Sequence, residues 1–219
     1  MYGLIRGPMV SIAFIVFVFG MIFQLIQFFK LTRKKGWVYP PGEIKFEKKT
    51  AGQWVAFCLA SLRGTLWRTD PLMMGVTWVF HVFLVGIPIF LLGHNILLDQ
   101  SWRLSLWSLP ESVTDLFSLV VLACIIFFLG RRLFVTRVRV ITTVYDYVVL
   151  LIAAVPFLTG YLAYHQWFDY DTVITLHILA GEVMLIAIPF TKLGHMLYFF
   201  LYRFLIGSEY SFARGARTW

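Results

Sequence analysis

The sequence predicts an all-α integral membrane protein with five transmembrane helices, and three observations lead to this fold class. Of the 219 residues, 60% are apolar and only 14% are charged, and the mean hydropathy is +0.80. This composition is typical of polytopic membrane proteins. Five apolar runs are long enough to cross a bilayer. The basic residues gather in alternate connections between these runs, as the positive-inside rule predicts.

The five apolar runs occupy most of the chain. They cover about residues 8–31, 72–98, 113–134, 143–164 and 173–206. The last run is longer than a bilayer requires, so we expect it to tilt or to extend past the membrane. We expect residues 1–219 to form a single membrane domain, because too few residues remain for a soluble one. No small-residue cleavage site follows the first run, which we interpret as a retained span.

The distribution of basic residues predicts the orientation of the spans. Nine Lys and Arg residues lie within residues 30–68 and four within residues 131–139. The second-to-third connection carries only Arg103, and the fourth-to-fifth carries none. The positive-inside rule therefore places the N-terminus outside and the C-terminus in the cytoplasm. The net charge of +8 belongs to this topology signal and does not indicate nucleic-acid binding.

The long basic connection between the first two spans contains a further helical pattern. Its apolar positions recur mostly at three- and four-residue steps within residues 51–67: Trp54, Phe57, Cys58, Leu62 and Leu66. Arg63 and Gly64 interrupt this segment, which is too short to span a bilayer. It is predicted to form an amphipathic helix on the cytoplasmic surface.

Four of the five histidines lie within the second and fifth predicted spans. Ionisable side chains are costly in a bilayer core and rarely occur there without a function. His177 and His195 are 18 residues apart, so one continuous helix would place both on the same face, about 27 Å apart. In the predicted topology, His94 has the depth of His177, and His81 has the depth of His195.

Each matched pair of histidines would supply both axial ligands of a low-spin haem b, which is suited to electron transfer. The competing interpretation is that these are polar residues hydrogen-bonded inside a helix bundle. His81 and His94 are 13 residues apart, so an ideal helix would aim them about 140° apart, unless Pro88 re-phases it. We therefore expect two haems, with a single haem as the fallback. His165, at the outer end of the fourth span, is interpreted as an interfacial residue.

Two further ionisable residues lie in the fifth span. Lys192 is three residues before His195, where it would either meet a haem propionate or extend to the cytoplasmic surface. Glu182 lies about 140° around the helix from His177. It is either a protonatable group near a quinone or a residue hydrogen-bonded to another span.

The histidine-bearing spans carry the motifs that relate the chain to a known family. Residues 188–195, IPFTKLGH, match a Pro-Phe-Ser/Thr-basic-Leu-x-His pattern, and FHVFLVGIPIFLLGH at residues 80–94 contains paired histidines. Both segments resemble the gamma (cytochrome b) subunit of respiratory nitrate reductase, although the histidine spacing in the second span is wider. The long basic first connection is similar to the related subunits of sulfate-reducer transmembrane redox complexes, such as the high-molecular-weight cytochrome complex.

This resemblance implies a set of site residues. It implies that two b haems are held by four axial ligands to haem iron, namely His81, His94, His177 and His195. It also implies Lys192 as the partner of a haem propionate. A quinone site beside the outer haem would include Gly93 and His94.

The resemblance also implies a function and partners. The protein would be an electron-transfer subunit of an oxidoreductase complex, in a prokaryotic cytoplasmic (inner) membrane, and menaquinone would be its substrate. An iron–sulfur subunit would bind on the cytoplasmic side, a multihaem cytochrome c on the outer side, and other membrane subunits and lipid would surround it. The alternatives are a stand-alone cytochrome b reductase and a haem-free membrane anchor or transporter subunit.

Overall fold

A computed structural model of the chain describes residues 2–33, 50, 52, 70–195, 198, 199 and 201. The regular structure within these residues is entirely helical, which confirms the predicted all-α class. Five segments of the described chain are long and apolar enough to cross a membrane: Ile5–Lys30, Pro71–Phe90, Glu111–Phe134, Val144–Tyr164 and Tyr170–Phe190. The chain divides into two compact units, Met1–Lys34 with Thr143–Trp219, and Lys35–Thr142, and each is described by itself.

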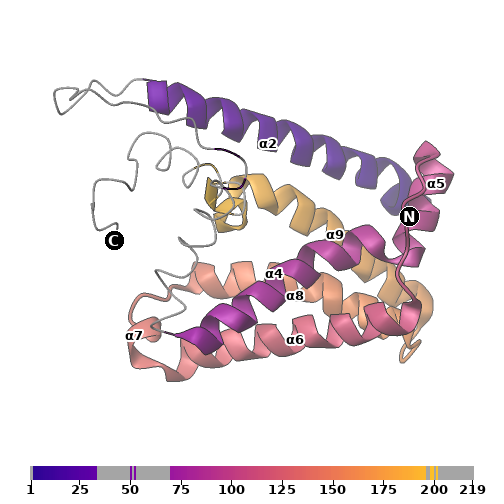
Figure 1. Cartoon of the computed structure of the whole chain (residues 1–219). Helices are drawn as coiled ribbons and strands as arrows, with labels where there is room; N and C mark the ends of the chain where they lie inside the picture. The colour runs from indigo at the N-terminus through magenta and orange to yellow at the C-terminus, as the bar shows by residue number, and fades with distance from the viewer. Residues whose placement is uncertain are drawn as a thin grey trace. The chain divides into compact units, whose positions relative to one another are not determined.

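The first unit is built around α9 (Tyr170–Phe190), against which α2 (Val10–Arg33) and α8 (Val144–Tyr164) both pack (Figure 1). α2 is preceded by α1 (Tyr2–Leu4) and by a single π-helical turn, η1 (Ile5–Met9), which contains Pro8. α8 begins beside Thr143, whose backbone N–H donates to the Asp146 carboxylate at 2.8 Å. The carboxylate of Asp169 caps α9 by accepting the Thr172 N–H at 2.9 Å, as helix N-termini require.

α2 and α9 approach each other closely where Gly20 faces Pro189. A Cβ atom on Gly20 would lie 2.7 Å from both Cβ and Cγ of Pro189, so a larger residue would not fit. One turn further along α2, Nε2 of Gln24 donates to the Pro189 carbonyl at 2.7 Å, while its Oε1 accepts from the Tyr198 hydroxyl at 2.5 Å. An unpaired carbonyl is costly in an apolar environment, so Gln24 stabilises the end of α9.

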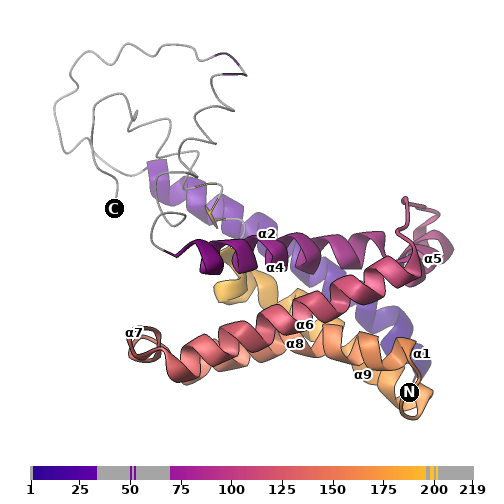
Figure 2. The same cartoon turned by 60° about the horizontal axis from the view of Figure 1, so that its bottom comes forward.

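The second unit contains α4 (Pro71–Phe90), α5 (Leu92–Trp102), α6 (Glu111–Phe134) and the short α7 (Thr136–Arg139). α4 and α6 pack against each other (Figure 2). Aromatic rings fill this interface. Phe83 stacks on Phe117 with ring centroids 4.1 Å apart, and Phe80 meets Phe128 edge-on at 5.2 Å.

An ion pair joins the start of α4 to the end of α6. The Asp70 carboxylate caps α4 by accepting the Met73 N–H at 3.0 Å, and it also accepts from the Arg131 guanidinium at 2.9 Å. The Met73 N–H and the Arg131 charge hold the pKa of Asp70 below its ordinary value. The carboxylate therefore stays ionised at neutral pH and keeps both interactions.

Both histidine-bearing spans end earlier than the sequence predicts. We expected helices over residues 72–98 and 173–206, but α4 ends at Phe90 and α9 ends at Phe190. Each end lies within two residues of a proline, Pro88 or Pro189, which removes a helical hydrogen bond and crowds the preceding turn. The next residue, Leu91 or Thr191, is extended, with ψ of 128° and −177° respectively. The chain then continues as α5 and as the 3₁₀ turn η2 (Lys192–Gly194).

The predicted amphipathic surface helix falls outside the described part of the chain. Within residues 51–67 only Gly52 is described, and it is helical and exposed. This surface helix and the orientation of the spans therefore stay predictions.

The predicted orientation can be tested with single cysteines in a background that carries Cys58→Ser and Cys124→Ser. A membrane-impermeant maleimide should label Asp171→Cys in intact cells, because Asp171 lies on the predicted outer connection and is exposed. Lys48→Cys should react only after the cells are lysed, since the basic first connection is predicted to be cytoplasmic. Labelling of Lys48→Cys but not Asp171→Cys in intact cells would invert the topology.

Candidate functional site

Four histidines share one type of hydrogen bond, although they lie in different elements. His81 on α4 and His94 on α5 belong to the second unit, whereas His177 on α9 and His195 after η2 belong to the first. In each, ring atom Nδ1 bonds to a backbone carbonyl oxygen. In the second unit, His81 bonds to Thr77 at 2.7 Å and His94 to Pro88 at 2.9 Å. In the first unit, His177 bonds to Pro156 at 2.9 Å and His195 to Lys192 at 2.6 Å.

This hydrogen bond determines the tautomer of each neutral ring. A carbonyl oxygen only accepts, so Nδ1 must carry the hydrogen, and Nε2 of the neutral imidazole then carries the lone pair. Histidines that ligate metals typically donate their other ring N–H to a carbonyl or carboxylate in this way. The four histidines thus have the donor atom that a haem iron requires. The same bonds are also compatible with polar residues that are merely satisfied inside a helix bundle.

The fifth histidine has a different setting. His165 follows the end of α8, and its ring lies 4.4 Å from Tyr161, 5.1 Å from Tyr164 and 5.8 Å from Trp167, measured between centroids. An aromatic cluster at a span end is typical of the membrane interface. The interfacial role of His165 stays a prediction.

His177 is held against α8 at a glycine. A Cβ atom on Gly160 would lie 2.9 Å from Cε1 and 3.2 Å from Nδ1 of the His177 ring. The hydroxyl of Thr159 also lies 3.4 Å from Nδ1, and the Pro156 carbonyl accepts from the same atom at 2.9 Å. Gly160 therefore leaves the space in which the His177 ring is oriented, a role that sequence analysis missed.

Gly160→Ala should displace the His177 ring, because a 2.9 Å contact with Cε1 is too short for a methyl group. We expect loss of the bond to Pro156 and a loss of stability of about 1–3 kcal/mol, as for other overpacked sites, measured by thermal unfolding in detergent. If His177 ligates haem, haem content should fall as well. Gly181→Ala on α9 is the matched control, since nothing lies within 4 Å of its Cβ position. Equal melting temperatures for the two variants would contradict this role of Gly160.

The break at Leu91 determines the setting of His94. Its Nδ1 reaches the Pro88 carbonyl six residues earlier, across the extended Leu91, which an unbroken helix would not allow. Burial lowers the pKa of the His94 ring below its ordinary value, so the ring is neutral at pH 7. The break lies between His81 and His94, where Pro88 was expected to re-phase the helix. Gly93, a predicted quinone-site residue, is the neighbour of His94 in α5 and is exposed.

The break at Thr191 corrects the prediction that His177 and His195 share one helix face. α9 ends at Phe190, so five continuous turns do not connect them. His195 instead follows η2, is exposed, and bonds to the Lys192 carbonyl at 2.6 Å. The 18-residue spacing therefore carries no information about the relative direction of the two rings.

Lys192 has a partner that sequence analysis did not identify. Its Nζ donates to Oδ1 of Asp146 at 2.7 Å and lies 5.2 Å from the centre of the Tyr145 ring. The Lys192 side chain is 59% exposed, and that of Asp146 is 10% exposed. The pair joins the start of α8 to the turn after α9. A haem propionate bound at Lys192 would either displace the Asp146 carboxylate or lie beside it.

Glu182 is a buried carboxylate within α9. It is 5% exposed, and its Oε1 has no hydrogen-bond partner in the part of the chain that is described.

Across the described residues, no three His, Cys, Asp or Glu side chains gather as a site for a bare metal ion. A haem iron takes only two axial protein ligands. Each predicted ligand pair joins a histidine of one unit to a histidine of the other, so the pairing stays a prediction.

One relative covers the chain from end to end. A protein of Nitratidesulfovibrio vulgaris strain Hildenborough is 34% identical over 223 residues, which span 100% of this chain and 97% of that protein. The chain therefore belongs to the same family as this protein, whose name, "Protein", states no activity. No protein-family model and no solved structure matches the chain.

Proposed function

We propose that the protein is a membrane cytochrome b subunit of a respiratory electron-transfer complex, which carries two b haems and exchanges electrons between a membrane quinone and partner redox subunits. The observation that supports this proposal most is the bond from Nδ1 to a backbone carbonyl that His81, His94, His177 and His195 share. A bound haem would supply one-electron transfer. The four carbonyls would keep Nε2 of each ligand unprotonated and hold the direction of each ring.

The helix ends favour a second candidate, a single haem held by His81 and His177. His81 lies nine residues before the end of α4 at Phe90, and His177 lies seven residues after the start of α9 at Tyr170. These separations are about 14 Å and 10 Å along the respective helices. In the predicted topology both helix ends mark the outer surface, so these two histidines have similar depths. His94 and His195 lie beyond the ends of their spans.

The proposed partners come from the family resemblance, and the predicted topology assigns each of them to one side of the membrane. The basic connection within residues 30–68 and the Arg-rich turn at residues 131–139 would face the cytoplasm, where an iron–sulfur subunit would dock. A multihaem cytochrome c would meet the outer face, and menaquinone would bind beside Gly93 and His94. In this proposal the protein lies in a prokaryotic cytoplasmic (inner) membrane, together with other membrane subunits.

A reduced-minus-oxidised optical spectrum of the purified full chain tests the proposed function. Haem b bands in the alpha region, with a haem-to-protein ratio of two or one, are expected for a cytochrome b. A haem-free anchor or transporter subunit would give no such bands, even when the chain is expressed with excess haem. A redox titration then separates two haems, which give two potentials, from a single haem, which gives one.

A further inference from the structure

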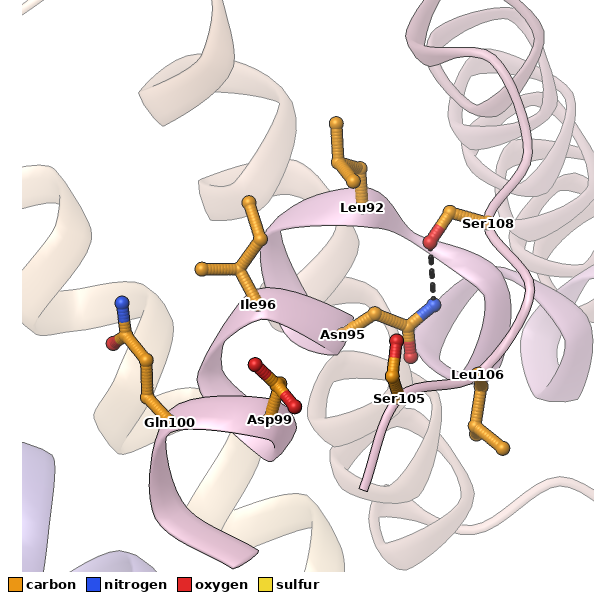
Figure 3. A pocket seen from close by; sticks show the side chains of 8 residues that line it. All are labelled: Leu92, Asn95, Ile96, Asp99, Gln100, Ser105, Leu106 and Ser108. Atoms are coloured by element: carbon orange, nitrogen blue, oxygen red, sulfur yellow. Dashed lines mark hydrogen bonds between the residues drawn. The ribbon is translucent and has the colours of Figure 1, made fainter. Parts of the chain in front are cut away.

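A pocket of about 200 Å³ lies beside α5 in the second unit, where the helix faces the segment that leads to α6 (Figure 3). One part of its lining is apolar and consists of Leu92, Ile96 and Leu106. The other part is polar and includes Asn95, Asp99 and Ser105. The pocket is therefore amphipathic, and its lining includes none of the predicted haem ligands or quinone-site residues.

Asn95 provides an acceptor that lacks a partner. The residue is 4% exposed, and its Nδ2 donates to the Ser108 hydroxyl at 2.8 Å and to the Trp107 carbonyl at 3.4 Å. The Trp107 carbonyl only accepts, so the end of the amide that faces it is the nitrogen and the other end is the oxygen. That atom, Oδ1, is buried and has no hydrogen-bond partner within the described chain. A buried acceptor left unpaired costs free energy, which a ligand that donates a hydrogen bond to it would recover.

The other polar atoms of the pocket favour the same kind of ligand. The Asp99 carboxylate and the Asn95 carbonyl only accept hydrogen bonds, and the Ser105 hydroxyl can accept as well. Asp99 is exposed and forms no ion pair with any residue that the structure describes. The pocket thus has one carboxylate and two further acceptor groups, which suit a cationic group with N–H donors better than an anion.

The position of the pocket indicates the source of this cation. α4, a candidate span, ends at Phe90, and the pocket begins two residues later at Leu92. Lipid head groups occupy the layer just outside the hydrocarbon core. We propose that the pocket binds a phospholipid with a primary ammonium head group, of the phosphatidylethanolamine type. Its three N–H groups would donate to Asn95, Asp99 and Ser105, and its apolar part would lie against Leu92, Ile96 and Leu106.

The proposal can be tested on the delipidated full chain in detergent, by native mass spectrometry and thermal unfolding. Phosphatidylethanolamine should be retained and should raise the melting temperature. Phosphatidylcholine with the same acyl chains has the same net charge but no N–H donor, and phosphatidylglycerol is anionic, so both should bind at least tenfold more weakly. Asp99→Asn and Ser105→Ala should each weaken phosphatidylethanolamine binding several-fold. Asp171→Asn, an exposed carboxylate outside the pocket, is the matched control.

Four outcomes would overturn the proposal. Equal binding of phosphatidylcholine would show that the N–H donors are not recognised. The same melting shift with free ethanolamine would show a site for a soluble ammonium compound, and a shift with Ca²⁺ alone, lost in Asp99→Asn, would show a metal site. Unchanged lipid binding by both Asp99→Asn and Ser105→Ala would show that the lipid does not bind in this pocket. Because Asp99 and Ser105 are exposed, these variants should fold, and none of these measurements depends on bound haem.

Discussion

His177→Ala should remove about half of the bound haem and leave the remainder spectroscopically intact. In the proposed two-haem protein, His177 and His94 hold the outer haem, whereas His195 and His81 hold the inner one. Each iron needs two axial ligands, so loss of one ligand releases one haem and spares the other. His195→Ala should remove the other half. The measurement is a haem assay with a redox titration, and the remaining haem should have a different midpoint potential in each variant because the two settings differ.

The same variants distinguish the two candidate ligand sets. A single haem held by His81 and His177 would be lost completely in His81→Ala and in His177→Ala. It would be retained in His94→Ala and in His195→Ala. His165→Ala is the control, since its ring lies in an aromatic cluster at the end of α8. If His81→Ala kept its full haem content and an unchanged titration, His81 would be excluded as a ligand in both schemes.

Gly20→Ala should destabilise the first unit more than a glycine-to-alanine substitution at any other described glycine of that unit. The new Cβ would lie 2.7 Å from two atoms of the Pro189 ring, and a proline ring cannot rotate away. Separation of α2 from α9 would also weaken the 2.7 Å bond between Gln24 and the Pro189 carbonyl. Overpacking of this kind costs about 1–3 kcal/mol, and the lost hydrogen bond adds about 1 kcal/mol. Thermal unfolding of the purified chain in detergent measures the sum.

Gly7→Ala is a suitable control for Gly20→Ala, because it adds the same methyl group to the same N-terminal segment and nothing lies within 4 Å of it. It should leave the melting temperature unchanged or raise it slightly, since alanine is the better helix former. Gln24→Leu tests the hydrogen bond separately from the close packing. If Gly20→Ala melted at the same temperature as Gly7→Ala, the approach of α2 to α9 would not stabilise the fold.

Hydropathy predicted the five spans well, because a bilayer requires about 20 apolar residues in each. It did not predict where α4 and α9 end, since apolar residues continue directly after Pro88 and resume a few residues after Pro189. Leu91 and Leu92 follow α4, and Leu193 lies in η2. Carbonyl groups near both ends are paired from elsewhere in the chain, by the Leu109 N–H at Phe90 and by the Gln24 side chain at Pro189. Such bonds involve residues far apart in the chain and leave no mark on a hydropathy pattern.

For the candidate site, the identity of the residues could be predicted from the sequence, whereas their hydrogen bonds could not. The residue types and the motif at residues 188–195 singled out the four histidines, but only the folded chain revealed their shared bonds to carbonyl oxygens. The partner of Lys192 was hidden because Asp146 lies 46 residues earlier and meets it only through the packing of α8 on α9. Gly160 was missed because a glycine in an apolar run gives no sign of the ring that it accommodates.

The end of α9 at Phe190 also gives this helix a length close to the thickness of a bilayer core. A single helix over residues 173–206 would be about 51 Å long, whereas the 21 residues of α9 span about 32 Å. The hydrocarbon core is about 30 Å thick, and each ångström of mismatch costs a fraction of a kcal/mol. A helix of this length would cross the core with little mismatch. Lys192 and His195 follow the break, and both are exposed.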